Sequence, residues 1–291
     1  MMHETWYLDC GKSMLEASNF IHWVEEIFSH QNDEMLSHDG DVIRNSHAFG
    51  PPTIHLVSTY GSGLVRILGQ TGQIGSSTKA KTIPALLEAL LLDGVIITID
   101  AMGCQQSIAR QIVESGADYV LAVKANQPTL LAHIRDTFDA IERVRTEDQD
   151  AFATIHYEVS KNKGQIETRR YVASDILTRG HRPGIWPGMR SILMVESHPE
   201  AGLAGASQRH YFVSSLSQNA HRIARAVRSH WSVGHKQHWC LDVALGEDQC
   251  RVCVADAAQN IAILRRIVTN LIKQDFSVKG ALHKSGRFQV D

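Results

Sequence analysis

The chain has 291 residues, of which 43% are hydrophobic and 21% are charged, and its formal net charge at pH 7 is -2. This balance is typical of a globular protein with one large domain or two modest ones. The sequence lacks an apolar run of about 18 residues and the basic start of a signal peptide, so membrane-spanning and secreted classes are excluded. A soluble, cytoplasmic protein is expected.

The number of cysteines also favours the cytoplasm, which is a reducing compartment. An odd and sparse set in a chain of this length suits a reducing environment better than a disulfide framework, so free thiols are expected. The five residues are Cys10, Cys104, Cys240, Cys250 and Cys253.

The charges are distributed unevenly along the chain. Residues 1–150 contain 10 Lys and Arg against 20 Asp and Glu, whereas residues 219–291 contain 11 against 6. The acidic half could hold cations and the basic half could bind a polyanion, although such an imbalance is also common on solvated surfaces. The net charge itself is unusual for a nucleic-acid-binding protein, because Lys and Arg normally supply most of the affinity for phosphate.

Apolar periodicity predicts the first elements of the chain. Apolar residues of the opening stretch roughly follow helical spacing, and a Gly-Ser-Gly turn between two apolar runs is a hairpin signal. Thr82 can cap a later helix that has Pro84 in its first turn. The expected elements are a helix over 1–32, a polar segment over 33–50, a hairpin of strands 53–60 and 64–69, and a helix over 84–92.

From residue 94 onwards, strands and helices alternate. Two β-branched apolar runs have the pattern of strands buried on both faces, and each is followed by an amphipathic stretch. This alternation predicts an α/β fold with parallel strands, followed by an antiparallel extension or insertion over 144–215 and by C-terminal helices. The expected strands are 94–100, 118–124, 153–159, 166–173, 191–196 and 209–215, and the expected helices are 103–115, 128–142, 219–241 and 255–273.

Two acidic positions are candidates for metal binding. Asp100 closes a buried strand, and ligands of open α/β sheets bind at the carboxyl ends of strands. Asp39 and Asp41 flank a glycine just before the predicted hairpin, where acids also make common surface turns. Magnesium is held by one or two carboxylates plus substrate phosphates, so Asp39 and Asp100 could form one site. The competing interpretation is that Asp100 caps the following helix.

Four segments carry a specific resemblance. They are VIITIDAMGCQ (95–105), DYVLAVKANQPTL (118–130), HWSVGHKQHWCLDV (230–243) and NIAILRRIVTNLIK (260–273). Over residues 36–273 the chain resembles the H-repeat-associated group of insertion-sequence transposases. The resemblance implies a ribonuclease H-like mixed sheet flanked by helices. It also implies an Asp, Asp, Glu triad that binds Mg²⁺, cuts the ends of an element and joins them to target DNA.

Carried over by position, the first acid of the family falls on Asp39 and the second on Asp100. The third acid, a Glu in the family's His-Trp-x-Ile-Glu-Asn segment, falls on Gly234, and the family's Lys of Asp-Gly-Lys-Thr-Leu-Arg is Asp41 here. Loss of a carboxylate removes charge and an oxygen ligand from the metal site, and glycine weakens a helix by about 1 kcal/mol relative to Ala. Cleavage is therefore expected to be impaired. Substitution of the third acid by Asp242, Glu247 or Asp248 is not expected, because each lies roughly 12 Å or more along a continuing helix.

A basic and aromatic set around the last motif is predicted to contact DNA. Such residues could grip phosphates and stack on unpaired bases, although Trp231 and Trp239 could equally be core residues and a Lys124 at a strand end often just reaches solvent. The predicted DNA-binding residues are Arg222, Arg225, Arg228, His230, Trp231, Lys236, Lys124, and also His238 with Trp239.

A competing hypothesis is a zinc site. The order His-x2-His followed by Cys-x2-Cys could ligate zinc tetrahedrally, but the resembled family has no zinc there. The residues concerned are His235, His238, Cys250 and Cys253.

The resemblance also predicts the domain organisation and partners. Residues 1–35 are expected to be a remnant of an N-terminal helical region, 36–275 the catalytic domain and 276–291 a tail. Relatives carry a longer region before the first acid, so an N-terminally shortened copy is expected. Its partners would be element ends and target DNA, and a homo-oligomer is compatible. The alternatives are a noncatalytic DNA-binding remnant, a zinc-binding DNA-binding module, and an ordinary ribonuclease H-like nuclease.

Overall fold

The computed structural model describes two compact units, each treated by itself. One comprises Met1–Ser29, Asp39–Leu90 and Val233–Asp291, and the other comprises His30–His38 and Leu91–Ser232. The described residues are 34–42, 54–61, 66–74, 79–144, 151–162, 165–179, 186–200, 207–239, 241–242, 245–247 and 257–274.

In the described part of the second unit, seven strands form one mixed sheet in the order β1, β4, β5, β9, β8, β7, β6. The strands β1, β4 and β5 run parallel, and each later neighbouring pair is antiparallel. Only the first part of β1, up to His38, belongs to this unit. The bounds are Met35–Val42 (β1), Ile96–Ile99 (β4), Asp118–Val123 (β5), Thr154–Asn162 (β6), Gln165–Ser174 (β7), Ser191–Glu200 (β8) and Gln208–Ser214 (β9).

The parallel strands form because their apolar runs are buried on both faces. All four residues of β4 are buried, as are four of the six in β5. Helix α3 (Gln106–Glu114) packs against β5 through Ile108, Ala109 and Ile112. A 3-10 turn, η1 (Ala101–Gly103), separates β4 from α3.

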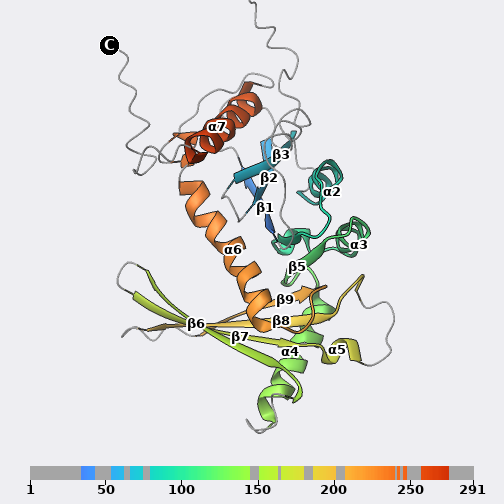
Figure 1. Ribbon diagram of the computed structural model, residues 1–291. Helices are drawn as coiled ribbons and strands as arrows, with labels where there is room; N and C mark the ends of the chain where they lie inside the picture. The colour runs from blue at the N-terminus through green and yellow to red at the C-terminus, as the bar shows by residue number, and fades with distance from the viewer. Residues whose placement is uncertain are drawn as a thin grey trace, which may run out of the picture. The chain divides into compact units, whose positions relative to one another are not determined.

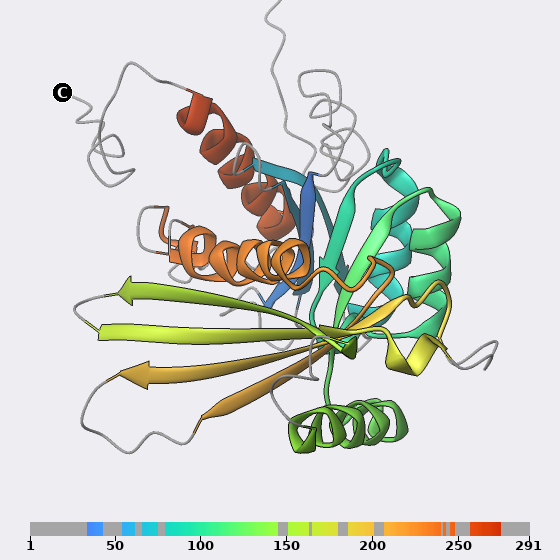
Figure 2. The same cartoon turned by 60° about the horizontal axis from the view of Figure 1, so that its bottom comes forward.

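The antiparallel strands carry a helix on each face. Figure 2 shows α6 (Ala220–Trp239) on one side of β6–β9 and α4 (Pro128–Arg143) on the other. On the α6 side, apolar residues of β7, β8 and β9 join Ile223, Ala224 and Val227 in one buried cluster. On the α4 side, the rings of Phe138 and Tyr211 stack at 6.4 Å. The short helix α5 (Ile176–Arg179) follows β7, and Figure 1 shows it beside the antiparallel strands, where it contacts β8.

The first unit contains a hairpin and two helices. The strands β2 (Ile54–Gly61) and β3 (Arg66–Ile74) are antiparallel, with a shift of register between Thr59 and Tyr60. Helices α2 (Lys79–Ala89) and α7 (Ala257–Gln274) both lie against β3. Arg266 of α7 is fully buried and donates through Nη2 to Glu247 Oε2 at 3.3 Å, a paired arrangement that a buried charge requires.

The α/β prediction is confirmed, with the mixed ribonuclease H-like sheet and its antiparallel extension. The segment expected to be polar, 33–50, contains strand β1, whose buried Ser37 shares a 3.0 Å hydrogen bond with Thr98. Helix α2 begins at Lys79, so Pro84 lies inside it and Thr82 is not its cap. The helix expected over 1–32 and the tail 276–291 lie outside the described residues. Within the part that is described, every helix is too short or too polar to cross a membrane.

Candidate functional site

Asp100 follows the last residue of β4 and is partly exposed. Its Oδ1 accepts a hydrogen bond of 3.2 Å from the backbone N–H of Met102, so it caps the η1 turn. The capping interpretation is therefore correct, but it uses one of the two carboxylate oxygens. Among the described residues, no side chain or backbone donor bonds to the other oxygen.

Lys124 follows the neighbouring parallel strand β5 and is exposed. The loop after it is tied to the turn after Asp100. The amide of Asn126 donates to the carbonyl of Ala101 at 2.6 Å, and the amide of Gln127 donates to the carbonyl of Cys104 at 2.9 Å. These two bonds hold the carboxyl ends of β4 and β5 in a fixed relation.

The next strand in the sheet extends past the end of β5. Tyr211 of β9 is paired with Val123, the last residue of β5, so Arg209 and His210 lie beyond the paired region. On its other side β9 remains paired with β8 through these residues. The sheet therefore has a step at the carboxyl end of β5.

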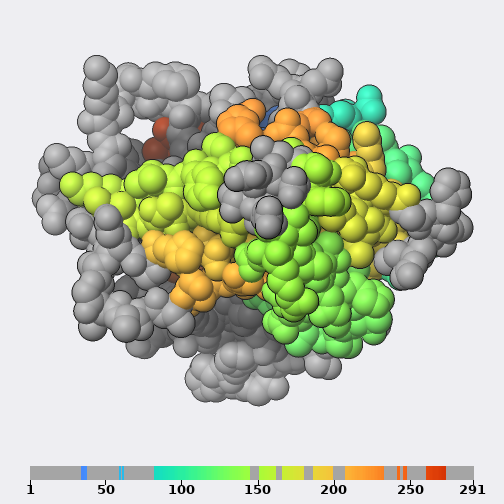
Figure 3. Space-filling view, turned by 90° about the horizontal axis from the view of Figure 1, so that it is seen from below, coloured from blue at the N-terminus to red at the C-terminus, as the bar shows by residue number. Residues whose placement is uncertain are grey.

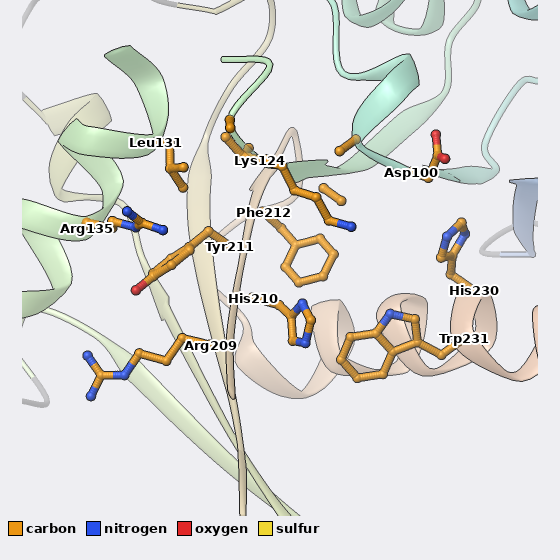
Figure 4. A pocket seen from close by; sticks show the side chains of 14 residues that line it. Asp100, Lys124, Leu131, Arg135, Arg209, His210, Tyr211, Phe212, His230 and Trp231 are labelled. Atoms are coloured by element: carbon orange, nitrogen blue, oxygen red, sulfur yellow. The ribbon is translucent and has the colours of Figure 1, made fainter. Parts of the chain in front are cut away.

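A cavity of about 420 Å³ occupies this step. Figure 4 shows Asp100 and His230 at one end, Tyr211 with Arg135 and Arg209 at the other, and Lys124 reaching between them. Apolar and aromatic side chains form more than half of the wall, and the charged lining residues are Asp100, Lys124, Arg135 and Arg209. The polar and aromatic lining residues include Asp100, Lys124, Arg135, Arg209, His210, Tyr211, His230 and Trp231.

Aromatic contacts hold the wall in place. The ring centroids of Trp231 and His210 lie 5.5 Å apart in an edge contact, and the guanidinium carbon of Arg169 lies 5.7 Å from the Trp231 ring. Arg135 lies 5.6 Å from the Tyr211 ring centroid. Cations at such distances are attracted to the ring face, so these arginines stiffen the cavity.

The cationic groups of the cavity differ in their pairing. Arg209 Nε lies 3.0 Å from Glu196 Oε1 and its Nη2 lies 3.1 Å from Glu142 Oε2. Burial opposes the charge, but the hydrogen bond and the charge of Glu196 raise the pKa of Arg209 above its ordinary value. Lys124 has no ion pair within the described part of the chain. Burial, and then the charge of Lys124, lower the pKa of His210.

A residue of strand β4 orients the imidazole ring of His230. Its Nδ1 lies 3.2 Å from the hydroxyl oxygen of Thr98, a buried residue of β4 that also bonds to Ser37 Oγ at 3.0 Å. A hydroxyl can donate one proton and accept others, so Thr98 can accept from Nδ1 while it donates to Ser37. His230 is thereby oriented beside Asp100 at the end of the cavity.

Comparison with known proteins assigns the chain to a family. The family described as Transposase DDE domain matches residues 33–271. The chain belongs to this family. The match includes every strand and helix that lines the cavity, so the cavity is part of a transposase DDE domain.

Individual relatives agree with this assignment. A putative transposase, YncI of Escherichia coli O157:H7, is 32% identical over 272 residues, which cover 91% of this chain and 68% of the relative. The H repeat-associated putative transposase YhhI of Escherichia coli K12 is 29% identical over 275 residues, covering 92% of this chain and 71% of the relative. The resemblance to the H-repeat-associated group is confirmed, and the chain is transposase-like in function.

The structure describes the three positions predicted for the catalytic acids to different extents. Asp100 lines the cavity. Asp39 lies in β1, and its side chain falls outside the described residues, as does Asp248. Gly234 lies inside helix α6. Glu247 is buried with Arg266, so its carboxylate is occupied by that guanidinium, and Asp242 is partly buried.

The predicted DNA-binding residues are separated by the structure. Lys124, His230 and Trp231 line the cavity, and Trp231 also packs against the core. Arg225 is exposed on α6, whereas Arg228 Nε lies 3.3 Å from Glu158 Oε2 and is engaged in that ion pair. Arg222 is partly buried. The side chains of Lys236, His238 and Trp239 fall outside the described residues.

The predicted zinc residues, His235, His238, Cys250 and Cys253, also fall outside the described side chains. Within the side chains that are described, no group of three or more His, Cys, Asp or Glu residues could hold a metal ion by itself. The cavity contributes one carboxylate, that of Asp100.

Sequence reasoning missed several cavity residues. Arg135, Arg209 and His210 were not predicted, and neither was the support that Thr98 gives to His230. Arg135 could have been found, since it lies one helical turn after the buried Leu131 of α4. Arg209 and His210 reach the cavity through the antiparallel pairing of β5 with β9, and His230 meets Thr98 across 132 positions, neither of which local sequence encodes.

Proposed function

We propose that the chain acts on DNA as an insertion-sequence transposase-type protein whose strand-cleavage chemistry is impaired at Gly234. The observation that carries the proposal is the cavity at the ends of β4 and β5, where the carboxylate of Asp100 and the ammonium of Lys124 line one space. On this proposal residues 36–275 form the catalytic domain, with 144–215 as its β extension.

Asp39 and Asp100 are the proposed ligands of Mg²⁺. Asp100 suits a divalent cation because it offers a carboxylate oxygen that accepts no other bond among the described residues, and Mg²⁺ prefers oxygen ligands. The parallel register ends with His38 opposite Ile99, the residues that precede Asp39 and Asp100 in the sequence. When bound, the ion would activate the attacking hydroxyl and stabilise the leaving oxygen.

Lys124 and Arg225 are proposed to hold DNA phosphates, because both are exposed cations. Trp231 and His210 give the cavity two aromatic rings, which suit stacking with an unpaired base. His230 is a further proposed DNA contact, because it lines the same cavity. Phosphate contacts of this kind would make binding depend on salt.

Gly234 is the proposed cause of impairment. It lies four residues after His230 in α6, and residues four apart share one helix face. A Glu at this position would lie on the face that carries His230, whereas glycine supplies no oxygen there. The alternative function is a noncatalytic DNA-binding remnant, which the occupied carboxylate of Glu247 favours because that acid cannot replace the missing one.

The test is Gly234→Glu. The purified full chain is incubated with Mg²⁺ and a supercoiled plasmid that carries its own gene with flanking DNA, and nicked product is measured. Recovered cleavage should exceed that of the unchanged chain by about a hundredfold, because metal-assisted stabilisation is worth several kcal/mol and each 1.4 kcal/mol is tenfold.

Two controls separate the possibilities. Gly234→Ala should stay inactive, and adding Asp100→Asn to Gly234→Glu should abolish the recovered cleavage. If Gly234→Glu binds the plasmid but never nicks it, the noncatalytic alternative holds and the impaired-enzyme proposal is wrong. If the chain binds no DNA, both are wrong.

A further inference from the structure

Strand β6 ends the described sheet of its unit. Its neighbour in the sheet is β7, and the strand order places no other described strand beside it. With nine residues, Thr154–Asn162, it is long for an edge strand. The outer N–H and C=O groups of an edge strand can pair with another chain, and native proteins usually shorten or cover such edges.

The two faces of β6 differ in how they are covered. On the α6 side, the rings of His156 and His221 lie 4.9 Å apart, and Glu158 pairs with Arg228 at 3.3 Å. On the opposite side, Tyr157 is 59% exposed and Val159 is 71% exposed. Figure 3 shows this open side, with the yellow-green strands at the surface and α4 in green beside them. Large apolar side chains in contiguous exposed positions indicate an interaction surface.

We propose that β6 pairs antiparallel with β6 of a second copy of this chain, about a twofold axis through Val159. Because the twofold axis is perpendicular to the sheet, the face that carries Tyr157 and Val159 lies on the same side of the combined sheet in both copies. Val159 then lies opposite the partner's Val159, and Tyr157 lies opposite the partner's Lys161. The two sheets become one continuous sheet.

The charges of the strand exclude two neighbouring registers, and the side-chain pairs favour the axis at Val159. An axis through Glu158 or Lys161 would set that residue opposite its own copy, and like charges directly opposite destabilise a sheet. With the axis at Val159, Glu158 faces the partner's Ser160 and each Lys161 faces a Tyr157. The ammonium can then lie over the phenol ring, and the two β-branched valines form a favourable cross-strand pair.

Self-complementarity also favours a second copy over an unrelated strand. The nine residues of β6 form both halves of the contact. A twofold contact closes after two chains, so neither copy keeps an unpaired β6 edge. In the dimer, the exposed side chains of Tyr157 and Val159 in each copy lie next to side chains of the other copy. This inference is independent of whether the chain cuts DNA.

The first experiment measures association of the purified full chain by sedimentation velocity over a concentration series. The unchanged chain should dimerise, and Val159→Glu should weaken dimerisation by about a hundredfold, because two like charges would face each other. The matched control is Val113→Glu, which places the same charge at an exposed valine of α3 and should leave the dimer intact. A chain that remains monomeric up to its solubility limit overturns the proposal, and so does a dimer that Val159→Glu leaves unchanged.

The second experiment tests the register by oxidation. Residues directly opposite each other in antiparallel strands have Cα atoms about 4.5 to 5.5 Å apart, within the range of a disulfide. Val159→Cys should therefore form a cross-linked dimer beyond the level of the unchanged chain. Tyr157→Cys and Lys161→Cys should each cross-link only when both changes are in the same chain. Cross-linking of Tyr157→Cys alone, without that of Val159→Cys, contradicts the Val159 axis.

Discussion

His210 is the residue whose protonation should report most directly on the cavity. Its pKa lies below the ordinary value of 6.5 because the ring is half-buried and because the ammonium of Lys124 repels a second positive charge. The folded protein therefore binds a proton at His210 less readily than the unfolded chain. This contribution to stability is present above pH 6.5 and decreases as the pH falls through the lowered value.

Lys124→Met should raise the pKa of His210, since one of the two causes is removed, but should leave it below 6.5 because burial persists. An NMR titration of the histidine ring would measure the change. Lys161→Met serves as the control, because Lys161 lies on β6 and outside the cavity. An unchanged pKa in Lys124→Met would show that the ammonium does not reach the cavity.

At the scale of single elements, the start of α6 offers a direct test of the fold. The side-chain oxygen of Asn219 accepts a hydrogen bond of 3.0 Å from the backbone N–H of Arg222, which is the geometry of a helix N-cap. Helix α6 carries His230 and Trp231 into the cavity, so its position depends on this first turn.

Asn219→Ala should lower the free energy of unfolding by about 1 kcal/mol, the usual cost of losing an N-cap side chain. Asn219→Asp should be nearly neutral, since its carboxylate can accept the same bond. Urea unfolding followed by circular dichroism would give both values. Equal losses in the two variants would mean that the side-chain oxygen is not the stabilising group.

The elements show where sequence reasoning succeeds and where it stops. Strands β4 and β5 were predictable because β-branched apolar runs are a local signal. Strand β1 was not, because its buried Ser37 is satisfied by Thr98, a residue 61 positions away. The candidate site follows the same division. Asp100 and Lys124 stand at strand ends that can be read locally, whereas Arg209 meets Glu142, 67 positions away, through strand pairing.

At the scale of the larger unit, an ion-pair network joins the antiparallel sheet to helix α4. Glu196 of β8 pairs with Arg209 of β9 at 3.0 Å and with Arg170 of β7 at 3.7 Å, and both arginines also reach Glu142 of α4. Burial alone would raise the pKa of Glu196, but its bond to Arg209 and the nearby positive charges hold that pKa below the ordinary value of 4.5.

Acid should therefore weaken the whole unit through this carboxylate. A lowered folded pKa gives stability that is present above about pH 4.5 and is lost as the pH falls through the folded value. Glu196→Gln should cost about 1.5 to 3 kcal/mol at neutral pH, the usual contribution of a hydrogen bond to a charged group. It should also flatten the decline below pH 4.5, as measured by thermal unfolding across pH.

Glu114→Gln is the matched control, because Glu114 is exposed on α3 and has no ion pair among the described residues. Its acid profile should follow that of the unchanged chain. A Glu196→Gln profile that still declines as steeply would assign the acid sensitivity to other carboxylates.

The tether between Asp100 and the peptide N–H of Met102 has a consequence for any ion that arrives at β4. With Oδ1 bonded to this N–H, Oδ2 is the oxygen that accepts no bond among the described residues, so in the proposed role Asp100 would bind the cation through that single oxygen. Its direction is fixed beforehand, and little rotational freedom remains to be lost on binding. Such a ligand favours small ions with strict octahedral demands over larger ones that accept two oxygens from one acid.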